Sequence, residues 1–389
     1  MPLIDKSGLL RRKGMKTDLW AAAVFVLGVL GGGCGQYTQK ITPVNPCVPS
    51  SSPEFAYVLN QDQISAYTVD SCTGGLTSTT PASVTTGLNP EDIAVDPSGR
   101  FVYAANLVSN AQDLATISMY TINPSTGALT PTTPATVPTG FFPQGIGIDP
   151  AGRFVYTANS DDNTVSMFTI NQNTGVLTPT TPPAVATGMS PLSITVDSTG
   201  RFAYAANQDD STVSMYTINQ STGVLTPTTP ATVPTGGSPF GVTLDPSGKF
   251  AYVPNAYAND TVSIYTVDAS TGVLSPAAAG TAPTLDNPTS VAVAPSGNFA
   301  YVVNRQANSV SMYTLDQTTG ALTPMGTPVM TGVQPFRITI EPDGKFVYVA
   351  NETGSVSIYT LNSDGTLTLV GTASTPIEAL AVEVVAPKK

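Results

Sequence analysis

From about residue 54 to the end, apolar and polar residues alternate in short runs that are separated by turn residues. One unit shows the pattern clearly, with runs at 193–196, 201–207, 212–218 and 224–230. The first two runs are separated by Asp-Ser-Thr-Gly at 197–200, a typical hairpin turn in which glycine takes a positive φ. Alternation with a period of two is typical of half-buried strands. The pattern therefore predicts four antiparallel strands in each unit.

The unit is repeated seven times, which two motifs mark. A Tyr-x-x-Asn motif recurs with its asparagines 46, 53, 48, 48, 49 and 47 residues apart, and each copy is followed by a run of the type Val-Ser-Met-Tyr. The seven tyrosines are Tyr57, Tyr103, Tyr156, Tyr204, Tyr252, Tyr301 and Tyr348. A fixed period of this length is the signature of a repeat architecture in which neighbouring units share a core.

The order of strands within the unit predicts a closed ring. Prolines crowd the fourth strand and would interrupt a central ladder, so this strand should lie at the outer edge. The first unit begins at Phe55 without a first strand, and the segment 375–384 is a first strand with nothing after it. Joining the two completes a seventh unit and removes the open edge. We predict an all-β fold over residues 54–389, a seven-bladed β-propeller of four-stranded antiparallel blades closed by its two terminal strands.

The repeats carry a resemblance to a known family. Tyr-Val-Val-Asn at 301–304 and Tyr-Val-Ala-Asn at 348–351, with runs such as Asp-Pro-Ser-Gly-Lys-Phe at 245–250, resemble the YVTN propellers. That family overlaps the seven-bladed lactonases typified by 6-phosphogluconolactonase, and the resemblance covers residues 54–386. It implies the propeller fold and, as one possible activity, lactone hydrolysis. Lactonase-like members often carry Arg-His after the proline of one inner strand, where this chain has Phe336-Arg337.

The first 33 residues have the pattern of a signal peptide. A basic stretch at 9–16 precedes twelve mostly apolar residues at 19–30, too few to span a bilayer but typical of a signal-peptide core. Gly31-Gly32-Gly33-Cys34 follows and resembles the lipobox of bacterial lipoproteins. We therefore expect a signal peptide over 1–33, lipidation and membrane attachment at Cys34, and a tether over 34–53. The alternative is an ordinary cleaved signal, and translation can begin at Met1 or Met15.

Export sets the expected location and the state of the remaining cysteines. The resemblance to lipoproteins implies a lipid-anchored protein of the cell envelope, at the outer membrane or cell surface; a soluble secreted or periplasmic protein is the alternative. Cys47 and Cys72 either form a disulfide that ties the tether to the folded body or remain free thiols.

Composition excludes several kinds of chemistry. The 389 residues contain no histidine, which rules out a Ser-His-Asp triad, a histidine base and histidine metal ligands. The formal net charge of −11 argues against nucleic-acid binding. The sequence has no phosphate-binding loop, Cys-x-x-Cys or nucleophile elbow, and we expect no cofactor. Acidic pairs such as Asp161-Asp162 and Asp209-Asp210 lack the spacing of calcium loops, so turn residues are the expected role and no metal is predicted.

Charged residues that depart from the repeat gather at one predicted end of the channel. The position two residues after the proline that leads each inner strand should face the channel mouth. In chain order it reads Asp92, Gly145, Ser193, Gly241, Ser290, Arg337 and Glu378. Arg337, Glu378 and Asp92 fall on three consecutive blades, and Arg305, Glu352 and Glu91 are expected on the same face as a ligand-binding rim.

Two interpretations of this cluster remain open. In lactone hydrolysis Arg337 would stabilise the oxyanion, and Glu378 or Asp92 would activate water. Alternatively, these charges are ion pairs that finish strand ends. The first hypothesis for function is a non-catalytic binding or scaffold propeller, expected to be a monomer with a protein, glycan or small-molecule ligand. The second is a lactone hydrolase. A redox propeller lacks ligand residues for haem or a quinone.

Overall fold

The computed structural model describes residues 47, 53–107, 115–257, 260–376 and 378–386. The signal peptide, Cys34 and most of the tether lie outside these residues. The compact unit that holds the described residues runs from Cys47 to Lys389. Among the residues that the structure describes, none belongs to a helix long and apolar enough to span a membrane.

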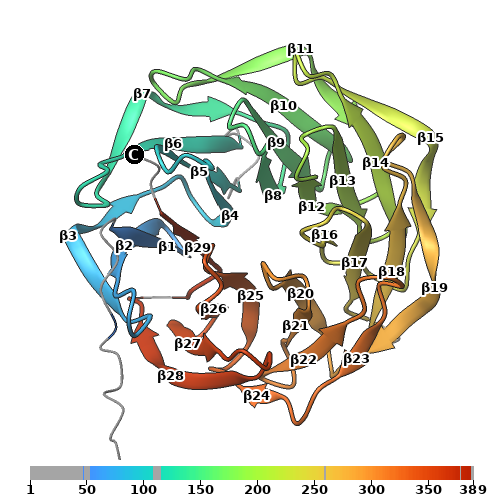
Figure 1. Cartoon of the computed structure of the whole chain (residues 1–389). Coiled ribbons are helices and arrows are strands. Elements are labelled where there is room, and N and C mark those ends of the chain that lie inside the picture. Colours follow the sequence, from blue (N-terminus) through green and yellow to red (C-terminus); the bar gives the residue numbers. More distant parts are fainter. Residues whose placement is uncertain (1–46, 48–52, 108–114, 258–259, 377, 387–389) are drawn as a thin grey trace, which may run out of the picture. The chain divides into compact units, whose positions relative to one another are not determined.

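Seven antiparallel sheets stand around a central channel, which confirms the predicted seven-bladed propeller (Figure 1). The innermost strands are β4 (Pro90–Val95), β8 (Pro143–Ile148), β12 (Pro191–Val196), β16 (Thr243–Leu244), β20 (Pro288–Val293), β25 (Pro335–Ile340) and β29 (Ala381–Val385). The second strands are β5 (Phe101–Asn106), β9 (Phe154–Asn159), β13 (Phe202–Asn207), β17 (Phe250–Asn255), β21 (Phe299–Asn304), β26 (Phe346–Asn351) and β1 (Glu54–Asn60).

The two outer positions of each blade complete the sheets. The third strands are β6 (Thr116–Ile122), β10 (Thr164–Ile170), β14 (Thr212–Ile218), β18 (Thr261–Val267), β22 (Ser309–Leu315), β27 (Ser355–Leu361) and β2 (Gln63–Val69). The outermost are β7 (Leu129–Pro138), β11 (Leu177–Ala186), β15 (Leu225–Pro234), β19 (Leu274–Pro283), β28 (Leu367–Ser374), β3 (Leu76–Thr85) and the pair β23 (Leu322–Pro324) and β24 (Val329–Met330). The proline-rich strand therefore lies at the outer edge, as predicted. In one blade the outer strand is split, because Gly326 turns with φ +56° and Pro328 follows it.

The ring is closed by its two ends. β29 pairs antiparallel with β1, so the sheet order of the closing blade is β29-β1-β2-β3. Figure 1 shows the red C-terminal strand beside the blue N-terminal ones. Cys47 and Cys72 are joined in a disulfide with their Cα atoms 5.7 Å apart, which fastens the chain before β1 to the closing blade.

The repeated tyrosine fastens each blade to the next. Each of the seven rings is buried, and its hydroxyl donates to the carbonyl of a turn glycine in the following blade; Tyr204 to Gly272 at 2.8 Å is one example. The last of these bonds, from Tyr348 to Gly74 at 3.0 Å, joins the final blade to the closing blade. The asparagine of the motif acts within its own blade, where its amide donates to the serine of the next strand, as Asn207 does to Ser214.

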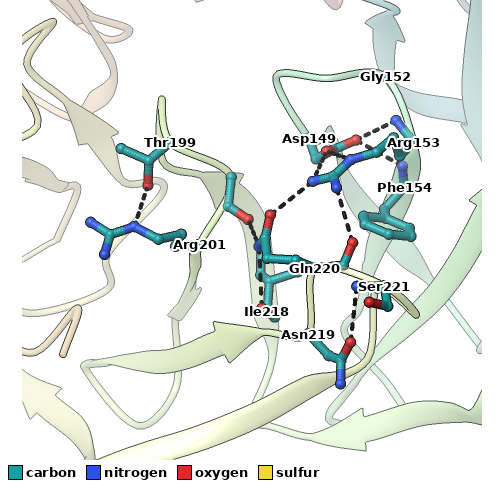
Figure 2. Close-up of polar contacts among 12 residues, drawn as sticks. Asp149, Gly152, Arg153, Phe154, Thr199, Arg201, Ile218, Asn219, Gln220 and Ser221 are labelled. Atoms are coloured by element: carbon teal, nitrogen blue, oxygen red, sulfur yellow. Dashed lines mark hydrogen bonds and ion pairs between the residues drawn. The ribbon is translucent and has the colours of Figure 1, made fainter. Parts of the chain in front are cut away.

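The face opposite the channel mouth carries a second set of contacts between blades. In Figure 2 the Arg153 guanidinium donates to the Gln220 backbone carbonyl at 2.9 Å and to its side-chain oxygen at 3.0 Å. Asp149 pairs with Arg153 at 3.0 Å, and Gln220 in turn donates to the Gly200 carbonyl. The arginines of the inner hairpins therefore serve the ring itself, away from the mouth.

Candidate functional site

The channel wall at the mouth is built from one side chain of each innermost strand. Strand pairing places six of them opposite the residue two positions after the repeated tyrosine, and the seventh, Gly241, lines the same cavity two residues before β16. The set reads Asp92, Gly145, Ser193, Gly241, Ser290, Arg337 and Ala381. Because five members are glycine, alanine or serine, a cavity of about 310 Å³ remains, and Asp92, Arg337 and Glu383 are among its lining residues.

Two of the residues that line this cavity form an ion pair, and they belong to the two blades that flank the closing blade. Arg337 Nη2 lies 3.2 Å from Asp92 Oδ2, and the two residues come from β25 and β4, on either side of β29. Ala381 stands between them at the same level, and its small side chain leaves room for the contact. From the sequence both residues are expected in one sector of the mouth, and there they form this ion pair.

Both carboxylate oxygens of Asp92 are engaged in hydrogen bonds or in the ion pair. Its Oδ1 accepts the Ile93 N–H at 3.0 Å, and its Oδ2 accepts the Ile146 N–H at 3.1 Å as well as Arg337. Burial raises the pKa of Asp92, while Arg337 and the two N–H groups oppose that rise. A carboxylate with both oxygens engaged is suited to fix the arginine rather than to take a proton from water.

Glu383 is a functional candidate outside the set predicted from the sequence. It lies on β29 one level deeper in the channel, in register with Tyr57, and lines the same cavity. Burial, together with the Asp92 charge, raises the pKa of Glu383 to about 8, against the opposing effect of Arg337. The side chain therefore holds a proton at neutral pH and can donate a hydrogen bond into the channel.

The expected place of Glu378 is corrected by the register of β29. Pro376 does not start the strand as the leading proline does in five of the other blades; the strand begins at Ala381, and Ala381 takes the mouth position. Glu378 is exposed outside the channel wall. A signal was present in the sequence, because an aliphatic residue follows the mouth position in every other blade, and Val382 rather than Ala379 fits that rule.

The rim of the mouth contains a second ion pair beside an aromatic ring. Arg305 Nη2 lies 2.7 Å from Glu352 Oε2, linking the hairpins β21–β22 and β26–β27. The guanidinium of Arg305 lies 5.7 Å from the centre of the Phe336 ring, and that of Arg337 lies 5.9 Å from it. Both guanidinium groups therefore lie within cation–π range of the one Phe336 ring.

Glu91 joins the two pairs electrostatically. Burial raises the pKa of Glu91 to about 7, and the charges of Asp92, Glu352 and Glu378 act in the same direction, while Arg337 opposes them. The expected residues Arg337, Asp92, Arg305, Glu352 and Glu91 are therefore neighbours in one sector, with Glu378 at its exposed border. A carboxyl group that titrates near neutral pH beside a fixed arginine can act as a general base.

The acidic pairs on the loops act as turn residues. Asp162 Oδ2 accepts the Phe141 N–H at 2.7 Å, and Asp210 Oδ2 accepts the Met189 N–H at 2.7 Å. Each bond ties the hairpin between the second and third strands of a blade to the loop that leads into the innermost strand of the same blade. This role agrees with the expectation from the sequence.

Comparison with known proteins shows a family match over most of the chain. Residues 49–142, 78–189, 131–239 and 241–380 match the family described as "Lactonase, 7-bladed beta-propeller". A search among curated proteins finds no match.

Several solved structures share the fold. A candidate 6-phosphogluconolactonase from Bacteroides uniformis has 20% sequence identity and a TM-score of 0.74, covering 86% of this chain and 100% of its own. A second candidate 6-phosphogluconolactonase, from Bacteroides fragilis, has 22% identity and a TM-score of 0.72, covering 87% and 100%. The periplasmic gluconolactonase PpgL of Pseudomonas aeruginosa has 19% identity and a TM-score of 0.72, covering 87% and 100%. At these identities the likeness shows the fold alone.

Proposed function

Because this chain belongs to the family of seven-bladed lactonase β-propellers, we propose that it hydrolyses small lactones at the mouth of its central channel. One observation carries the proposal. An ion pair with the buried Asp92 fixes the half-buried Arg337 beside two carboxyl groups, Glu91 and Glu383, whose pKa values are raised to about 7 and about 8. Raised carboxyl pKa values next to a positioned cation are typical of acid–base sites.

Each group has a distinct role in the proposed reaction. Glu91 takes a proton from water as the oxygen adds to the lactone carbonyl carbon, and Arg337 stabilises the negative charge on the carbonyl oxygen. The ring carbon–oxygen bond then breaks, and the protonated Glu383 gives its proton to the leaving oxygen. The product is the open hydroxy acid. Asp92 is a positioning residue that holds Arg337.

The charge of the mouth supports an uncharged substrate. Arg305 and Arg337 are each already paired with a carboxylate, and further carboxyl groups surround them. No cation of this sector is left unpaired among the described residues to receive a phosphate group. We therefore propose a sugar-derived lactone without a phosphate as the substrate class.

A non-catalytic binding module is the second candidate function, and one surface feature favours it. Large apolar side chains are exposed on the loops that lead into five of the innermost strands. They are Leu88, Phe141, Met189, Leu285 and Val333. Exposed apolar groups around a polar opening are typical of interaction surfaces. Export and attachment through Cys34 remain proposals for either function.

The test is hydrolysis of a lactone panel by the purified protein. We expect turnover of glucono-1,5-lactone to exceed that of its 6-phosphate, and Arg337→Ala to lower kcat by about 10²–10³-fold because the oxyanion loses its partner. Arg201→Ala is the matched control, since this arginine serves a hairpin on the opposite face. It should leave turnover unchanged.

The result also decides between the two candidate functions. Absence of turnover across the panel, or equal turnover by the Arg337→Ala variant with its fold intact by circular dichroism, would remove the hydrolase proposal. The binding module would then be the remaining candidate.

A further inference from the structure

A second cluster of charged side chains lies at the far end of the blades, where the inner hairpins turn. In four blades the hairpin begins with an aspartate whose carboxylate accepts backbone N–H groups of the same turn. Asp245 Oδ1, for example, accepts from Lys249 at 2.8 Å and from Phe250 at 2.7 Å. Asp96, Asp149 and Asp197 do the same in their blades. The buried charge of each is thereby satisfied.

Glu341 takes this position in the blade β25–β28, but its carboxylate does not accept the backbone N–H groups of its turn. Its hairpin has the same length, but the side chain is one methylene longer than aspartate. Glu341 is 0% exposed, and neither carboxylate oxygen has a hydrogen-bond partner among the residues that the structure describes. A buried carboxylate without a partner is strongly unfavourable, so this one requires a compensating group.

Two more carboxylates lie close to the Glu341 carboxylate. Glu54 begins β1 in the neighbouring closing blade, and Asp343 lies in the Glu341 hairpin; one oxygen from each of the three residues lies within 4.8 Å of the others. One oxygen of Glu54 is also buried, with no hydrogen-bond partner in the described part of the chain. In register, Glu54 stands where three blades carry an arginine, so the charge at this position is reversed. Lys345 is the nearby cation, and it is paired with Asp343 at 2.5 Å.

We propose that Glu54, Glu341 and Asp343 form a binding site for one divalent cation, with Ca²⁺ as the best fit. All three ligands are hard carboxylate oxygens, which suit Ca²⁺ and not a metal that prefers nitrogen or sulfur. Ca²⁺–oxygen bonds are about 2.3–2.6 Å long, so oxygens up to about 5 Å apart can bind one ion. The 4.8 Å limit of this cluster satisfies that condition without movement of the backbone.

The site would have a structural purpose. Glu54 belongs to the closing blade, whereas Glu341 and Asp343 belong to the blade before it. An ion held between them joins the first strand of the chain to the last complete blade, at the junction where the ring closes. This purpose is independent of the channel mouth, because the hairpin lies at the other end of β25 from Pro335.

The test uses the purified full chain, freed of metal with a chelator and titrated with CaCl2 alone. Isothermal titration calorimetry should show uptake of one Ca²⁺ per chain, and the unfolding temperature should rise with the Ca²⁺ concentration. Glu341→Gln keeps the shape of the side chain and should abolish both responses. Without Ca²⁺ this variant should unfold at the same or a higher temperature than the parent, since a buried charge is removed.

Two further variants keep the result decisive. Glu54 lies at a half-buried strand start, and Glu54→Gln should also lose Ca²⁺ uptake. This variant tests the site if Glu341→Gln does not fold. Asp286→Asn removes one exposed negative charge elsewhere and should bind Ca²⁺ like the parent. The proposal is overturned if the parent takes up no Ca²⁺, or if both glutamine variants take it up as the parent does; a proton shared between Glu54 and Glu341 would then balance the buried charge.

Discussion

At the residue scale, the chemistry of this protein lies where single residues depart from the repeat. Glycine, serine and alanine occupy most mouth positions, and Asp92 and Arg337 are the exceptions. One level deeper, the innermost strands carry alanine, glycine or threonine, and Glu383 is the exception. A charged side chain in the channel destabilises the fold unless it is paired or protonated. Asp92 and Arg337 are paired with each other, and Glu383 beside them is protonated.

Glu383 should make folding stability depend on pH. Its pKa is about 8 in the folded protein against 4.5 for an ordinary glutamate, so the folded chain keeps a proton that the unfolded chain releases. Stability should therefore fall as the pH rises from about 4.5 to 8. Glu383→Gln should remove this loss and stabilise the protein at pH 8 by on the order of 1–2 kcal/mol, after allowance for water in the channel, with no such gain at pH 4.

Urea unfolding at pH 4, 6 and 8 measures this effect. Glu383→Asp keeps a titratable carboxyl in the channel and should keep the pH dependence. Identical pH profiles for the parent and Glu383→Gln would show that Glu383 is not the group responsible.

At the element scale, neighbouring blades are locked by a turn glycine and an aromatic ring. The third-to-fourth strand turn of each blade ends in a glycine with positive φ that packs against the phenylalanine opening the second strand of the blade before it, as Gly272 packs against Phe202. The carbonyl of the same glycine accepts the tyrosine hydroxyl of that blade. The turn therefore supplies backbone conformation, close packing and a hydrogen bond to one junction.

Two glycines of one blade separate the packing effect from the backbone effect. Gly272 has φ +74°, and an added Cβ would lie 2.2 Å from Phe202 Cδ1; Gly280 has φ +67° and nothing within 4 Å. Gly280→Ala should cost only the left-handed conformation, about 1–2 kcal/mol. Gly272→Ala should cost about 1–3 kcal/mol more, because the buried Phe202 must move. Urea denaturation of both variants measures the difference in the free energy of unfolding. Equal losses of stability would show that the packing of Gly272 against Phe202 does not fasten the two blades.

At the scale of the whole molecule, the ring depends on one short strand. β29 is the only contribution of the C-terminal segment to the described closing blade, where it pairs with residues 55–59 of β1. It buries Val382 and Val385, which are 2% and 8% exposed. The disulfide and the Tyr348 bond to Gly74 fasten the same region from other directions.

A chain that ends at Leu380 should lose closure. The lost burial of the two valines alone costs about 3–6 kcal/mol, and the exposed edge of β1 invites pairing between molecules. Thermal unfolding should shift to lower temperature and size-exclusion chromatography should reveal oligomers. A chain that ends at Ala386 retains β29 and is the matched control. Equal unfolding temperatures and equal elution of the two chains would show that β29 does not close the ring.

The sequence by itself determined the architecture of this protein. Period-two alternation, turn glycines and the repeated Tyr-x-x-Asn motif are local patterns, and they were enough to predict seven blades, the outer proline-rich strand and the closure by both termini. They also placed Arg337 and Asp92 at one mouth, because the repeat gives equivalent positions the same place in each blade, and the structure joins the two in an ion pair.

Only the tertiary structure decided which side chains meet where the repeat fails. The last innermost strand begins at Ala381, so Glu383 enters the channel and Glu378 does not. The meeting of Glu54 with Glu341 joins residues from opposite ends of the chain. Such contacts depend on how blades pack around the ring, and the local alternation of residues holds no information about that packing.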